Sequence, residues 1–90
     1  MKIRYSKKFD KSLDDIYKYI ALYNPIAANK QIEKFYNLIM LLKTNPYLGV
    51  IGRVENTREL FIPNTKYFLV YEIETDFVYI LNIIHTAKNY

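Results

Sequence analysis

The side chains best able to do chemistry lie in the second half of this 90-residue chain. They are Arg53, Arg58, Glu59, Lys66, His85, Lys88 and Tyr90. Cleaving RNA without a metal requires a base for the 2′-hydroxyl proton, a cation for the charge that develops on the phosphate, and an acid for the leaving 5′-oxygen. His85 could be the base or the acid, because an imidazole exchanges its proton readily near neutral pH. Arg58 could hold the phosphate through two hydrogen bonds, while Tyr90 or Lys88 donates a proton.

The same residues also have purely structural interpretations. A single histidine at the end of a strand is commonly a hydrogen-bonding residue, and Arg58-Glu59 could form charge pairs across neighbouring strands. The residue types alone therefore leave open whether this set catalyses a reaction or contacts a partner.

The composition of the chain argues against a metal site and against a cofactor site. The chain has no cysteine, one histidine and two glycines, which excludes Cys-based zinc sites, multi-histidine sites and a glycine-rich phosphate loop. Asp14 and Asp15 would point about 100° apart on a helix, and Glu72 and Glu74 share a strand face without a third ligand. We expect no metal and no cofactor.

Length and charge indicate one domain over residues 1–90, acting in the cytoplasm and not in a membrane. No apolar run approaches the roughly 18 residues that span a bilayer, and residues 1–10 are too charged for a signal peptide. The net charge of +4 resides entirely in the first 11 residues. Such a basic end suits an acidic partner, although a solvated lysine face is an equally simple interpretation.

The first half of the chain predicts a short strand over residues 2–5 and two amphipathic helices. Ser6 offers an N-cap for the first helix, and Pro25 can open the second, which should end near Asn45-Pro46. Apolar residues of the first helix recur at spacings of three and four: Phe9, Leu13, Ile16, Tyr17, Ile20 and Tyr23. The matching stripe of the second helix is Ala28, Ile32, Phe35, Ile39 and Leu42. The short connection makes the two helices an antiparallel hairpin.

The second half predicts an antiparallel meander of three strands rich in β-branched and aromatic residues. These strands are Arg58–Ile62, Tyr67–Glu74 and Phe77–His85. The order β-α-α-β-β-β is an α+β fold with a helical hairpin packed on a mainly antiparallel sheet. One sheet face should pack on the helices, and the other should carry exposed aromatics or meet a partner. Gly49 and Gly52 predict a turn from helix to sheet.

Several motifs in combination resemble the RelE/ParE superfamily of bacterial toxins from type II toxin-antitoxin modules. They are Gly52-Arg53, Thr57-Arg58-Glu59-Leu60, the strand Leu69-Val70-Tyr71 and a last strand ending in Ile83-Ile84-His85. The helical first half agrees, so the resemblance covers nearly the whole chain.

The resemblance implies a toxin held inactive by a cognate antitoxin, whose C-terminal segment wraps the toxin, in some cases as a heterotetramer. RelE-like members cleave messenger RNA on the ribosome, whereas ParE-like members block DNA gyrase. The Thr-Arg-Glu-Leu strand and the terminal histidine are closer to the ParE-like, plasmid-stabilisation branch. In the ribonuclease branch a catalytic arginine often precedes the Leu-Val-Tyr strand, and Phe68 stands there in this chain. Residues 67–90 also carry one lysine against three acidic residues, a local charge of −2.

The leading hypothesis is therefore a ParE-like toxin that blocks gyrase by binding it. The target-binding residues would be Arg53, Arg58, Lys66, His85 and Lys88. Two alternatives stay open. One is a metal-independent, ribosome-dependent mRNA endoribonuclease with Arg58, His85 and Tyr90 as catalytic residues. The other is a nontoxic, degenerate toxin that binds only its antitoxin.

Overall fold

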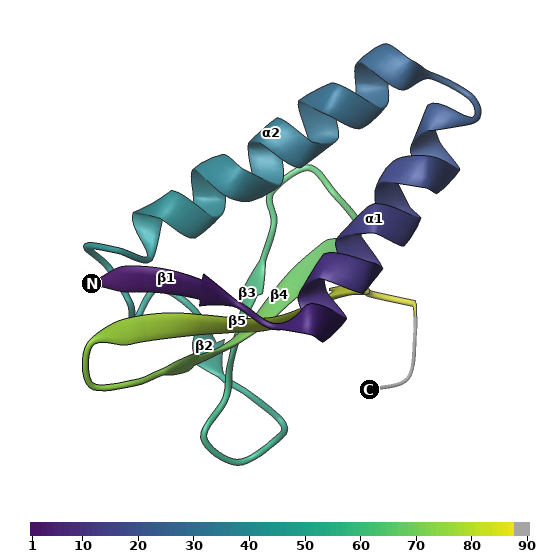
Figure 1. Cartoon of the computed structure of the whole chain (residues 1–90). Coiled ribbons are helices and arrows are strands. Elements are labelled where there is room, and N and C mark those ends of the chain that lie inside the picture. The colour runs from purple at the N-terminus through teal and green to yellow at the C-terminus, as the bar shows by residue number, and fades with distance from the viewer. Residues whose placement is uncertain (88–90) are drawn as a thin grey trace.

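Two helices cover one face of a five-stranded sheet in the computed structural model, which describes residues 1–87 (Figure 1). The elements in chain order are β1 (Lys2–Tyr5), α1 (Lys7–Ala21), α2 (Pro25–Leu41), β2 (Val50–Ile51), β3 (Arg58–Phe61), β4 (Tyr67–Ile73) and β5 (Phe77–His85). The predicted α+β fold, with its helical hairpin on a mainly antiparallel sheet, is confirmed. The short strand β2 is an addition, because the sequence predicted only a turn there.

Polar caps fix where the two helices begin. The Ser6 hydroxyl accepts a hydrogen bond from the Phe9 N–H at 2.9 Å and donates one to the Leu81 carbonyl at 2.6 Å. It therefore caps α1 and also ties the start of the helix to β5. The Asn24 side chain accepts a hydrogen bond from the Ala27 N–H at 3.1 Å and caps α2 in the same way.

The strand order is β1-β5-β4-β3-β2, with β1 parallel to β5 and every other pair antiparallel. The N-terminal strand is thus one edge of the sheet, and the two-residue β2 is the other. The register sets Arg58 opposite Tyr71 and His85 opposite Tyr67. Arg58 and His85 therefore lie on opposite sides of β4, opposite residues that are four positions apart along that strand.

The core lies between the helices and the near face of the sheet. The helices contribute Phe9 and Leu13 from α1 and Phe35 and Ile39 from α2. The sheet contributes Leu69, Tyr71, Val78, Ile80 and Ile83. Tyr23 departs from the predicted apolar stripe and is 79% exposed. The reason is that α1 ends at Ala21, and the turn that follows projects beyond the sheet (Figure 1).

The far face of the sheet carries an exposed aromatic ring, that of Phe61, but the middle of this face is covered. Phe68 and Val70 are 1% and 2% exposed. The Phe61 ring lies 5.4 Å from the Phe68 ring, and the Arg53 guanidinium lies 5.3 Å from the same ring. The segment between β2 and β3 therefore helps to cover this face, while Phe61 itself stays largely exposed.

Neither helix within residues 1–87 has both the length and the apolarity that crossing a membrane would require.

Candidate functional site

The predicted site residues are distributed between the two ends of the sheet. Arg53 lies in the segment between β2 and β3, and Arg58 opens β3. Lys66 immediately precedes β4, and His85 ends β5. The other two predicted residues, Lys88 and Tyr90, lie outside the described residues.

Arg53 forms an ion pair with a buried carboxylate. Glu59, 5% exposed, accepts hydrogen bonds from the Arg53 backbone N–H at 3.0 Å, from Nε at 3.3 Å and from Nη2 at 3.0 Å. Charge-assisted bonds of this kind stabilise a carboxylate that burial would otherwise penalise. The arginine that pairs with Glu59 is therefore Arg53, and the neighbouring Arg58 has other partners.

Arg58 belongs to a network that fastens the loop between α2 and β2. Its Nη1 donates a hydrogen bond to the Gly49 carbonyl at 2.8 Å, and its guanidinium carbon lies 4.8 Å from the centre of the Tyr47 ring. The hydroxyl of Tyr71, which is fully buried, donates to the Pro46 carbonyl at 2.7 Å and accepts from the Gly49 N–H at 2.8 Å. Burial raises the pKa of Tyr71, although the Gly49 bond and the Arg58 charge act in the opposite direction. Tyr71 therefore remains a neutral phenol that can donate.

Arg58 also lines an open polar cleft of about 570 Å³. The cleft is bounded by Tyr47, Asn56, Arg58, Glu72, Ile73 and Glu74. Within residues 1–87, no three histidine or acidic side chains come together as metal ligands. The chemistry of this cleft is therefore that of one guanidinium beside two carboxylates.

His85 lies at the opposite end of the sheet and makes a local hydrogen bond. Its Nδ1 accepts from the Ala87 N–H at 3.0 Å, and its ring packs edge-to-face on Tyr67 with centroids 5.2 Å apart. Next to it, the Lys66 carbonyl accepts from the Thr86 N–H at 2.7 Å, which leaves the exposed Lys66 side chain available to solvent.

The register gives the separation between Arg58 and His85. Tyr71 and Tyr67, their partners on β4, are four positions apart along that strand, and β3 and β5 lie on opposite sides of it. At ~3.3 Å per residue and ~4.8 Å between strands, the two Cα atoms are about 16 Å apart. The structure therefore does not bring the predicted phosphate-binding arginine and the predicted proton-transfer histidine together.

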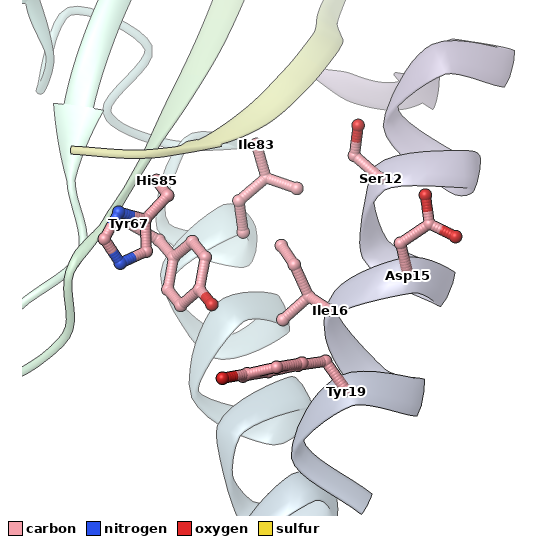
Figure 2. Close-up of a pocket in the computed structure, with 7 residues that line it drawn as sticks. All are labelled: Ser12, Asp15, Ile16, Tyr19, Tyr67, Ile83 and His85. Carbon is pink, nitrogen blue, oxygen red and sulfur yellow. The ribbon is translucent and has the colours of Figure 1, made fainter. Parts of the chain in front are cut away.

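A cavity of about 340 Å³ lies between α1 and the end of β5 that carries His85 (Figure 2). We call it the α1–β5 cavity; its lining is Ser12, Asp15, Ile16, Tyr19, Tyr67, Ile83 and His85. The pKa of Tyr67 is raised by burial first and by the nearby Tyr19 second.

Of the seven residues that line this cavity, sequence reasoning singled out only His85 as a candidate functional residue. The spacing of Ser12, Asp15 and Tyr19 does place them on one side of a helix. What the sequence did not reveal is which strand end that side of the helix meets.

Comparison with known proteins gives consistent matches over nearly the whole chain. Residues 3–90 match the sequence profile of a family described as the ParE toxin of the type II toxin-antitoxin system parDE. Y4kP of Sinorhizobium fredii, a protein named as a toxin, is 30% identical over 89 residues, which cover 99% of this chain and 92% of that protein.

Solved structures show the same fold. A chain of the chromosomal ParDE TA system from P. aeruginosa superposes with a TM-score of 0.84 at 23% identity, covering 94% of this chain and 95% of that one. YafQ from E. coli superposes with a TM-score of 0.66 at 18% identity, covering 94% of this chain and 92% of that one.

Proposed function

The chain belongs to the ParE toxin family of type II toxin-antitoxin systems, and from that premise we propose that it arrests growth by binding DNA gyrase in the cytoplasm. In this proposal the toxin performs no chemistry of its own. A cognate antitoxin neutralises it by covering its surface, in a complex that can assemble as a heterotetramer.

The observation that supports a binding mechanism is that the polar side chains of the predicted site lie far apart. A metal-free ribonuclease needs its base, its acid and its phosphate-binding cation around one phosphate, within about 3 Å of the groups they serve. Arg58 and His85 are about 16 Å apart by the register of β4. Arg53 is engaged with Glu59, and Arg58 with the Gly49 carbonyl. Such an arrangement suits a surface that a large partner covers better than it suits a reaction centre.

Arg58 is the residue expected to matter most for the target. It combines a guanidinium, an aromatic neighbour in Tyr47 and an open cleft, which are features common among residues that dominate protein interfaces. Arg53, also exposed in part, would add a second contact at the same end of the sheet. Lys66 and His85 would contact the target from the other end. Lys88 is also proposed as a contact residue, although it lies outside the described residues.

The antitoxin has an apolar surface available at the β2 edge, beside Arg58, which is the register partner of Ile51. Val50 and Ile51 are 63% and 81% exposed, and no strand within residues 1–87 pairs with the outer side of β2. A second apolar groove of about 410 Å³, between α2 and the segment after β3, is lined by Leu38, Leu41 and Ile62, among others. An apolar antitoxin segment would bury these side chains, and an added strand would pair with the free edge.

Pulse labelling of DNA, RNA and protein synthesis within minutes of inducing the chain without antitoxin tests the target. We expect DNA synthesis to stop first while translation continues, and purified toxin to inhibit gyrase supercoiling. An early stop in translation with cleaved transcripts would instead favour the endoribonuclease. Normal growth with folded toxin present would favour the degenerate, antitoxin-binding module.

The Arg58→Ala variant tests the contact residue. It should lose growth inhibition, whereas Lys30→Ala, an exposed substitution on α2, should retain it. Because Arg58 also holds the Gly49 carbonyl, both variants need circular dichroism and thermal melting to verify folding. Full toxicity of a folded Arg58→Ala protein would remove this residue from the target contact.

A further inference from the structure

The α1–β5 cavity has a lining that the function proposed above leaves largely unused. Ile16 and Ile83 supply apolar surface, and Tyr19 and Tyr67 contribute aromatic rings from opposite sides (Figure 2). The polar groups come from Ser12, Asp15 and His85. Its volume, about 340 Å³, lies in the range of sites that hold a small ligand or one large side chain.

The cavity carries a negative charge in a chain whose net charge is +4. Among the described residues that line it, Asp15 supplies the only carboxylate, and none is a lysine or an arginine. Asp15 pairs with Lys11 at 2.8 Å, but both side chains are more than half exposed. Such exposed pairs are weak, so a better-placed cation can compete for the carboxylate.

The hydroxyl groups of the cavity can accept hydrogen bonds. No partner within residues 1–87 occupies the hydroxyls of Ser12, Tyr19 and Tyr67. The His85 Nδ1 is already bonded to the Ala87 N–H. An occupant rich in hydrogen-bond donors therefore fits this cavity.

The aromatic rings of the cavity indicate which kind of donor-rich group fits it best. The Tyr67 ring is held in place by edge-to-face contacts with Phe35 at 5.7 Å and with His85 at 5.2 Å. Tyr19 is 64% exposed, so its face is accessible to a partner. A planar cation stacks on tyrosine faces, and a guanidinium offers five donors where an ammonium offers three.

We propose that the α1–β5 cavity receives an arginine side chain of a protein partner. The guanidinium would lie against Tyr19 and Tyr67 and donate hydrogen bonds to the Asp15 carboxylate and the neighbouring hydroxyls. The inference holds for any protein that presents an exposed arginine, so it does not depend on gyrase being the target. A nucleotide suits the cavity less well, because the Asp15 carboxylate would repel its phosphate.

Titration of the isotope-labelled full chain with N-acetyl-arginine amide, followed by NMR, tests the proposal directly. At low ionic strength and millimolar probe, we expect shifts concentrated at Tyr19, Tyr67 and His85. The neutral isostere N-acetyl-citrulline amide, at the same concentration, should give at most about a tenth of the affinity, because it loses the charge that strengthens the hydrogen bonds.

Asp15→Asn and Asp14→Asn form a matched pair. Each aspartate binds a lysine four residues away on α1, and their side chains are 58% and 53% exposed, but only Asp15 lines the cavity. Asp15→Asn should weaken binding of the arginine probe about tenfold, and Asp14→Asn should leave it unchanged. The dispersion of the spectra shows whether each variant is folded.

Three results would overturn the proposal. One is equal binding of the citrulline and arginine probes, and a second is equal loss of affinity in the two asparagine variants. The third is tighter binding of uridine 5′-monophosphate than of the arginine probe at the same residues, which would identify a nucleotide site. Arginine binding that persists in a toxin without effect on gyrase would support this inference and contradict only the proposed target.

Discussion

Replacing Tyr71 by phenylalanine should destabilise the protein strongly although it removes a single oxygen atom. The Tyr71 hydroxyl donates to the Pro46 carbonyl at 2.7 Å and accepts from the Gly49 N–H at 2.8 Å. The phenylalanine ring fills the same space, so the substitution leaves no large void. Its cost comes from two backbone groups of the α2–β2 loop that lose their partner.

The size of this destabilisation depends on how deeply the two backbone groups are buried. Gly49 is buried, so its unpaired N–H costs about 1–3 kcal/mol, whereas the carbonyl of Pro46, a half-buried residue, costs about 1 kcal/mol. The sum is about 2–4 kcal/mol. A 90-residue chain has an unfolding entropy near 0.19 kcal/mol/K at ~2.1 cal/mol/K per residue, so the melting temperature should fall by about 10–20 °C.

Differential scanning calorimetry of Tyr71→Phe beside Tyr36→Phe measures this cost. Tyr36 is a half-buried tyrosine whose hydroxyl has no hydrogen-bond partner within residues 1–87, so its loss should change stability by only ~0.5 kcal/mol or less. Amide hydrogen exchange at Gly49 should accelerate in Tyr71→Phe alone. Melting temperatures of the two variants within about 3 °C of each other would refute the view that this hydroxyl organises the loop.

Three further predictions concern local geometry and pH. Gly49→Ala should cost about 1–3 kcal/mol by overpacking, since a Cβ there would lie 2.7 Å from the Tyr71 hydroxyl oxygen and 2.8 Å from the Glu59 carbonyl; urea denaturation measures it. Ser6→Ala should cost about 1–2 kcal/mol in the same assay, because α1 loses its cap and the Leu81 carbonyl loses a donor. Burial raises the pKa of four tyrosines above the ordinary value of 10.0: Tyr5, Tyr36, Tyr67 and Tyr71. Above about pH 10 the unfolded chain therefore releases protons that the folded chain retains. The free energy of unfolding, which is unaffected below that pH, should then decrease as the pH rises. Denaturant titrations between pH 8 and 11 measure this decrease.

The features that the sequence predicted well are those set by neighbouring residues. Ser6 caps the first helix because a short polar side chain can reach the N–H three residues ahead, whatever the rest of the fold does. Pro25 opens the second helix because its fixed backbone angle suits the first helical position. The predicted bounds of the three long strands are correct to within one residue, because turn residues mark their ends.

The candidate site depends instead on strand order, register and loop path, which no local pattern encodes. The placement of β4 between Arg58 and His85 follows from the pairing of the whole sheet. The pairing of Glu59 with Arg53, not with a residue of a neighbouring strand, depends on the path of the β2–β3 segment. The α1–β5 cavity likewise requires knowing which strand end α1 meets.

The separation that argues against a reaction centre is no obstacle to a binding surface. A standard interface buries about 800 Å² on each partner, which corresponds to a patch roughly 30 Å across. Arg58 and His85, about 16 Å apart by the strand register, fit within one such patch. They contribute to the same binding event only if a single partner covers both ends of the sheet. A substitution of Arg58 and a substitution of His85 should then each weaken binding of the partner. The double variant should lose the sum of the two free energies, as expected for two distant contacts. A reaction centre would give strongly non-additive losses, because its members act on the same atoms.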